Sequence, residues 1–293
     1  MVSGNTIGSG YQVGGKKAGM RRTWGLLIFM LAGLVAYYGF RVEPHWIEVR
    51  HVTVDVQTPF DALRGKTAVH LTDLHIGRMG ERETQVLEIL ADVGPDMIFL
   101  TGDYIHWRGD AGAALAFLGS LRAPDGVWAV MGDYDYSDDR QSCLFCHAQG
   151  SGAATKAHGV RFLRNSGERV EMGDGPVLVG GVDVQAFREF DGWRSFLGGD
   201  GELPAVLLSH SPLVFDEIDG SQPVLVLAGD THGGQIPLPG WVWGILGYEK
   251  TARYSQGWFE KGRSRMFVSR GVGTSHWSVR LLRRPEVVVL HFR

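Results

Sequence analysis

Five short polar blocks rich in aspartate and histidine stand at the ends of apolar runs in this 293-residue sequence. Aspartate and histidine side chains supply the oxygen and nitrogen ligands that divalent metal ions take in proteins. One such block alone is weak evidence, but five at equivalent positions predict a single metal site. The blocks are Asp73-Leu-His75, Gly102-Asp103, Gly132-Asp-Tyr-Asp135, His210 and Gly229-Asp-Thr-His232.

The apolar runs before these blocks have the length and composition of buried strands. In an open α/β sheet the carboxyl ends of parallel strands meet at one edge, so ligands far apart in the sequence can converge there. Two helical patterns, 81–93 and 111–121, alternate with the first runs and indicate parallel strands, whereas the chain from residue 160 onward is richer in strands. We therefore expect an α/β fold with two sheets face to face and helices outside. The strand-like runs are 68–72, 97–101, 127–131, 205–209 and 224–228.

An uncharged run of 18 residues, 23–40, lies near the N-terminus. A membrane span needs about 20 apolar residues, with roughly 17 as the lower limit, so this run qualifies as a transmembrane anchor. We expect a disordered basic tail at 1–22 before the anchor and one domain at 45–293 after it. A cleaved export signal and a buried core helix are the alternatives.

The charge distribution predicts the orientation of the chain in the membrane and argues against nucleic acid as a partner. Four basic residues and no acidic ones precede the apolar run, which predicts a cytoplasmic N-terminus and an extracytoplasmic domain on a single-pass protein of the inner membrane. The rest of the chain carries 25 basic and 32 acidic residues. This acidic balance argues against nucleic acid as a partner, and the bilayer is the partner we expect. The sequence does not indicate an oligomeric state.

The order and spacing of the five blocks resemble the calcineurin-like metallophosphoesterases, in particular their membrane-anchored bacterial branch. That family has the pattern D-x-H, G-D, G-N-H-[DE], a lone H and G-H-x-H, and the resemblance covers about residues 45–293. It implies a two-sheet sandwich flanked by helices and two divalent cations. By this resemblance, the first cation is held by Asp73, His75, Asp103 and His232. The second is held by Asp103, Asp133, His210 and Asp230.

Three positions depart from the family pattern, and all concern the second cation. Asp133 replaces an asparagine, Asp230 replaces a histidine, and Tyr134 replaces the histidine that faces the phosphate or the leaving group. Two divalent cations and the family's two aspartates leave about two positive charges, whereas four aspartates leave about none. The carboxylates favour manganese, iron or magnesium over zinc. Tyr134 and Asp135 are the candidate catalytic residues, although a phenol, with an ordinary pKa of about 10 against about 6.5 for imidazole, is the weaker acid.

The two cysteines, Cys143 and Cys146, precede His147 in the spacing that attaches c-type haem. Covalent haem on these three residues is one interpretation. A local disulfide and a reduced pair are the alternatives.

The resemblance implies a membrane-anchored, metal-dependent hydrolase of a phosphomonoester, phosphodiester or pyrophosphate, in which a metal-bridging hydroxide attacks phosphorus. An apolar segment, 237–248, contains two tryptophans and either dips into the bilayer to meet a lipid substrate or fills the domain core. A catalytically weak or inactive metal-binding or haem-binding module is the alternative function, and turn-capping is the alternative role for the strand-end aspartates. Further candidates for contact with a phosphate are Arg253, Arg270, His276 and Arg280.

Overall fold

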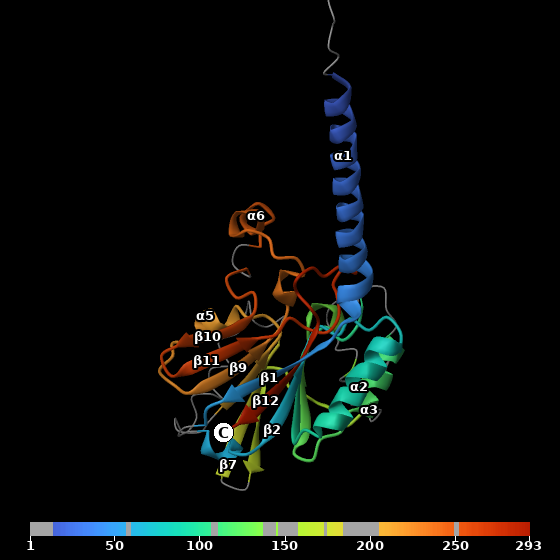
Figure 1. Ribbon diagram of the computed structural model, residues 1–293. Coiled ribbons are helices and arrows are strands. Elements are labelled where there is room, and N and C mark those ends of the chain that lie inside the picture. The colour runs from blue at the N-terminus through green and yellow to red at the C-terminus, as the bar shows by residue number, and fades with distance from the viewer. Residues whose placement is uncertain are drawn as a thin grey trace, which may run out of the picture.

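The structure is a computed structural model that describes residues 14–56, 60–106, 111–136, 145, 158–172, 175–183, 205–248 and 252–293, with the side chains of residues 14–21 and 205 excepted. In it, two six-stranded sheets pack face to face (Figure 1). The first sheet has the order β1 (Glu48–Val54), β12 (Glu286–Phe292), β2 (Thr67–Leu71), β3 (Met97–Thr101), β4 (Gly126–Val130) and β5 (Arg161–Phe162). The second has the order β10 (Gly257–Lys261), β11 (Ser264–Val268), β9 (Val224–Ala228), β8 (Ala205–Ser209), β7 (Gly175–Val182) and β6 (Ser166–Met172).

Helices cover the outer faces of the two sheets, as the alternation of side chains along each strand requires. On β3, Ile98 and Leu100 face a core shared with α2 (Glu81–Val93) and α3 (Ala111–Ser120). Phe99, between them, faces the core between the sheets, which it shares with Leu227 and Phe267 of the second sheet. The short helix α5 (Val214–Glu217) packs on the outer face of the second sheet. The predicted α/β fold, with two sheets face to face and helices outside, is confirmed.

The strands that precede the five polar blocks run parallel to one another within each sheet. β2 pairs with β3, β3 with β4, and β8 with β9, all in parallel. Their bounds match the five predicted apolar runs to within one residue at either end. The carboxyl ends of these strands therefore lie at the same edge of each sheet, and the blocks that follow them meet there.

The N-terminal helix α1 (Gly14–Tyr37) projects from one end of the molecule (Figure 1). It begins inside the segment 1–22 that we expected to be disordered, because residues 14–22 are mostly good helix formers that continue directly into the apolar run. A π-helical turn, η1 (Tyr38–Val42), and a 3-10 turn, η2 (Glu43–His45), extend it. The segment Arg22–His45 is long and apolar enough to cross a membrane, with a mean hydropathy of 1.7, and only 6% of its most apolar window is buried. A cleaved signal sequence would satisfy the same criterion.

The base of α1 is attached to the loop between β11 and β12. The Arg280 amide donates to the Gly39 carbonyl oxygen at 2.9 Å. The fully buried Glu43 carboxylate accepts from the Leu282 amide at 2.8 Å and from the Arg283 amide. Only two residues separate η2 from β1. The helix therefore joins the domain through direct hydrogen bonds and a very short connector.

We expect Glu43→Ala to lower the free energy of unfolding by about 1–3 kcal/mol, because it leaves two amides without their acceptor. Thermal denaturation of the full chain in detergent measures the loss. Glu88→Ala, on the exposed face of α2, is the matched control and should change stability by less than about 0.5 kcal/mol. Equal stability of the Glu43 variant and the wild type would contradict the inferred attachment.

Candidate metal centre

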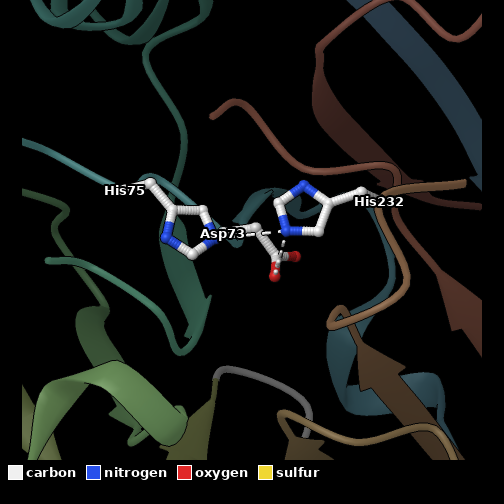
Figure 2. Close-up of side chains that lie close together, drawn as sticks. All are labelled: Asp73, His75 and His232. Atoms are coloured by element: carbon white, nitrogen blue, oxygen red, sulfur yellow. Dashed lines mark hydrogen bonds and ion pairs between the residues drawn. The ribbon is translucent and has the colours of Figure 1, made fainter. Parts of the chain in front are cut away.

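Three predicted ligands from two blocks point toward one another (Figure 2). Asp73 and His75 follow β2, and His232 begins the turn η6 (His232–Gly234) after β9. The Nε2 atoms of His75 and His232 are 3.2 Å apart, and His232 Nε2 lies 3.4 Å from Asp73 Oδ1. All three side chains are buried. One carboxylate oxygen and two imidazole nitrogens thus lie close enough together to hold one cation.

A second group shares Asp73 and adds Asp103 and His210. Asp103 Oδ2 lies 3.5 Å from Nε2 of His75 and 3.5 Å from Nε2 of His210. The Asp103 carboxylate is therefore placed between the two groups. This arrangement is what a ligand shared by two cations requires.

The backbone of the site occupies conformations that residues other than glycine rarely adopt. Five site residues have a positive φ, between 45° and 73°: Asp73, His75, Asp103, Asp230 and His232. Such strain, of order 1–3 kcal/mol for each residue, persists only where the surrounding structure enforces it, and it concentrates at functional sites.

Glycines let these strained segments approach one another. A Cβ on Gly132 would come within 2.2 Å of Asp103 Oδ1, and a Cβ on Gly229 would come within 2.0 Å of Thr72 Oγ1. A Cβ on Gly271 would come within 2.6 Å of the Asp73 Cβ. The glycines of the third and fifth blocks and of the β11–β12 loop therefore make room for the ligand side chains and their neighbours.

Hydrogen bonds fix the orientation of the acidic ligands. Asp73 accepts from the Thr72 hydroxyl at 2.9 Å and from the Asp230 amide at 3.1 Å. Asp103 Oδ1 accepts from the Tyr134 amide at 3.1 Å, which leaves Oδ2 directed at the two histidines.

His210 shows most clearly that the site suits a cation. Its Nδ1 lies 2.8 Å from the Thr101 carbonyl oxygen, which can only accept, so Nδ1 carries the hydrogen and Nε2 faces the carboxylates. His210 Nε2 is buried and has no hydrogen-bond partner among the described residues. A buried imidazole nitrogen without a hydrogen-bond partner is costly, and a metal ion would satisfy it.

The electrostatics of the cluster also favour a cation. Burial lowers the pKa of His75 to about 3, and it raises the pKa of Asp73 and of Asp103 above the ordinary carboxyl range. Burial raises the pKa of Asp230 to about 6. Burial opposes a charge on His210, but the attraction of the neighbouring carboxylates, first of all Asp103 and Asp230, outweighs it and raises the His210 pKa to about 10. A proton therefore stays at His210 unless a metal ion replaces it.

The residues that depart from the family pattern lie less deep. Asp230 is a third exposed, and its Oδ1 is 3.9 Å from His210 Nε2. Asp133 is exposed, and its carboxylate is not part of either ligand group. The rings of Tyr134 and His75 meet edge to face, with centroids 5.2 Å apart. Asp73, His75, Asp103, His210 and His232 thus converge, Asp230 borders them, and Asp133 does not join them.

Asp135 is not placed for the catalytic role that we predicted. Its side chain is fully buried, and its two oxygens accept from the amides of Gly132, Asp103 and Tyr104 at 2.7–2.8 Å and from the Ile105 amide at 3.3 Å. These four bonds tie the second block to the third. Its oxygens are occupied by backbone donors, and through them Asp135 helps to position Asp103.

Three of the candidate phosphate contacts have other partners. Arg253 pairs with Asp216 at 2.6 Å, and Arg270 pairs with Glu48 at 2.8 Å and also with Glu286. Arg280 is fully buried, and it donates to the carbonyls of several loop residues and lies 3.4 Å from Nδ1 of His232. Its role behind His232 had no signal in the sequence, because its partners are backbone carbonyls.

Cys143, Cys146 and His147 lie outside the described residues, so haem attachment stays a prediction.

We expect the affinity for Mn²⁺ to rise with pH. The pKa values of His210 and Asp230 are raised, so both side chains hold their protons more tightly than they would in water. A cation that binds there must displace these protons. Affinity should rise by up to about tenfold per pH unit for each proton displaced, most steeply below pH 6 where Asp230 is also protonated. Isothermal titration between pH 5 and pH 8 in buffers of different ionisation enthalpy measures both the affinity and the proton release.

Asp230→Asn is the control for this titration, since it removes one of the two protons and should flatten the dependence below pH 6. An affinity for Mn²⁺ that is constant across this range, with no proton release, would contradict the described electrostatics.

No family model matches the sequence, whereas curated proteins match along most of its length. The chain is 27% identical to the uncharacterized metallophosphoesterase YkuE of Bacillus subtilis, over 86% of this chain and 88% of that protein. It is 24% identical to the UDP-2,3-diacylglucosamine pyrophosphatase LpxG of Chlamydia trachomatis, over 85% of this chain and 90% of that protein. It is 26% identical to the phosphodiesterase YaeI of Escherichia coli, over 85% of this chain and 89% of that protein.

Among solved structures, that of Yfce, a phosphoesterase from E. coli, superposes with a TM-score of 0.33 at 15% identity, over 72% of this chain and 82% of that chain. So weak a superposition supports no argument. The nearly full-length matches to metallophosphoesterases agree with the order of the five blocks and with their convergence at one edge of the sandwich. These matches support the calcineurin-like metallophosphoesterase superfamily for this chain and, with it, the hydrolysis of a phosphoester bond.

Proposed function

We propose that this chain is a membrane-anchored, extracytoplasmic phosphoester hydrolase whose substrate is an amphiphilic phosphomonoester, phosphodiester or pyrophosphate at the bilayer surface. The similarity to metallophosphoesterases supports the hydrolysis of a phosphoester. The main observation in support of a membrane-bound substrate is an exposed apolar helix, α6 (Gly240–Ile245), at the same end of the molecule as α1 (Figure 1).

Two divalent cations fit the residues present. Asp73, His75, Asp103 and His232 would hold one, and Asp103, His210 and Asp230 would hold the other. Bound there, the cations would activate water and neutralise the phosphate oxygens. Because carboxylates outnumber imidazoles around the second position, manganese, iron or magnesium suits it better than zinc.

The segment around α6 is exposed and apolar, which excludes the alternative that it fills the core. Trp241 is 69% exposed and Ile245 is 76% exposed, and no residue of α6 is buried. Trp277 and Leu282, in the loop that holds the base of α1, are about 70% exposed as well. Aromatic and aliphatic side chains on one end of a protein, beside an apolar helix, suit the interface of a bilayer.

The same segment contacts the turn that carries one of the metal ligands. The Trp243 indole packs on Gly234, where a Cβ would come within 2.7 Å of the ring. Gly234 is the last residue of η6, the turn that begins with His232. A membrane-bound α6 would therefore hold the site next to the bilayer surface, where the phosphate groups of amphiphilic esters lie.

Two further observations support the proposal. One relative of the chain, LpxG, is by its name a pyrophosphatase of a diacylated sugar nucleotide. Basic residues at 16, 17, 21 and 22 precede the apolar part of α1, which favours a cytoplasmic N-terminus and puts the domain on the opposite side of the membrane.

The test compares one substrate in a bilayer with one in solution. The full chain, reconstituted with Mn²⁺ into phosphatidylcholine vesicles, should hydrolyse a diacylglycerol phosphate or a diacylglycerol pyrophosphate in the same bilayer. Trp241→Ala combined with Ile245→Ala should slow this reaction about tenfold. Burial of the two large apolar side chains in the bilayer contributes at least about 1.4 kcal/mol to membrane binding, and the double variant loses it. Hydrolysis of soluble p-nitrophenyl phosphate should stay within about twofold of the wild type.

Asp103→Asn is the control, and it should abolish both reactions because it removes the shared ligand. Hydrolysis of soluble esters with no activity on either bilayer lipid would overturn the amphiphilic substrate. An equal loss on both substrates in the α6 variant would show that α6 only stabilises the fold.

A further inference from the structure

Tyr134 and His276 form a pair beside the metal centre. The Tyr134 hydroxyl lies 3.5 Å from Nδ1 of His276, and the two rings meet edge to face with centroids 6.2 Å apart. The Tyr134 ring also meets the His75 ring edge to face, and the Tyr134 amide donates to Asp103 Oδ1. Tyr134 therefore reaches from the ligands of the metal centre to His276.

The Gln235 side chain bonds to the backbone on both sides of His276. The Gln235 amide oxygen accepts from the Ser275 amide at 2.8 Å, and its nitrogen donates to the Trp277 carbonyl at 3.4 Å. These two residues flank His276 on either side. Gln235 lies directly after η6, three residues beyond His232. The loop that carries His276 is thus tied to the segment that carries a metal ligand.

The chemistry of the site leaves a role for this imidazole. Hydrolysis of an ester of an aliphatic alcohol expels an alkoxide, a poor leaving group unless it receives a proton as the P–O bond breaks. Among the four candidate phosphate contacts, the three arginines are engaged in ion pairs or buried. His276 is exposed to solvent, and imidazole is the side chain best suited to exchange protons near neutral pH.

We propose that His276 is the general acid for the leaving group, and that Tyr134 and Gln235 position it. Water adds to phosphorus and gives up a proton to solvent. The P–O bond to the alcohol breaks, and the leaving oxygen keeps the electron pair and takes a proton from His276. His276 then regains a proton from solvent. This inference rests on the proposed hydrolysis of an aliphatic phosphoester.

The experiment compares two leaving groups in the full chain loaded with Mn²⁺. His276→Ala should lower kcat for an alkyl phosphate about 100-fold, the lower end of the range for general acid catalysis. For p-nitrophenyl phosphate, whose leaving group departs without a proton, kcat should stay within about threefold. Added imidazole should restore part of the activity on the alkyl ester. Tyr134→Phe and Gln235→Ala should show smaller losses confined to the alkyl ester.

His51→Ala, which removes an exposed histidine on the edge strand β1, is the matched control and should change neither reaction. Titration with Mn²⁺ should give the same affinity for His276→Ala and the wild type. Equal losses on both esters, no loss on either, or no rescue by imidazole would overturn the role of His276. A wild type that hydrolyses only the nitrophenyl ester would overturn it too, whereas a wild type inactive on both esters would overturn the proposed function itself.

Discussion

The Asp103 carboxylate lies 3.5 Å from two imidazole nitrogens, and the surrounding structure is built to hold it there. Asp135 accepts from the amides of Asp103 and Gly132, and the glycine at 132 leaves room for the Asp103 carboxylate. Without a cation, the buried carboxylates repel one another and retain protons. With cations, the same arrangement has the ligands that it needs. The residues with positive φ in these blocks are the ones that supply the candidate ligands.

The site and the N-terminal helix share one supporting loop. The segment between β11 and β12 packs Gly271 against Asp73, buries Arg280 behind His232 and binds the base of α1 through Gly39 and Glu43. Further along, it carries the exposed Trp277 and Leu282. A domain attached in this way holds its metal centre at a fixed height beside the helix. This arrangement would suit the membrane-bound substrate that we propose.

The order of strands and the convergence of the blocks follow from local sequence. Each block comes at the end of a buried strand, and parallel pairing brings strand ends together, so the fold and the proximity of Asp73, Asp103 and His210 were predictable. The role of Asp135 was not, because a carboxylate that binds four amides has the same sequence signal as one that meets a substrate. Arg280 was equally hidden, since its partners are carbonyls, which every residue has. His276 was a candidate for contact with a phosphate from the sequence, but its proposed role as an acid depends on its contacts with Tyr134 and the Gln235 segment, which are distant in sequence.

The central claim is that Asp103 is shared by two cations, and metal content tests it most directly. The full chain, purified in detergent with excess Mn²⁺ and freed of unbound ions, should contain two manganese ions per chain by elemental analysis. Asp103→Asn should contain at most one, with the protein still folded by its thermal transition. One ion or none in the wild type, or two ions in the Asp103 variant, would contradict the account.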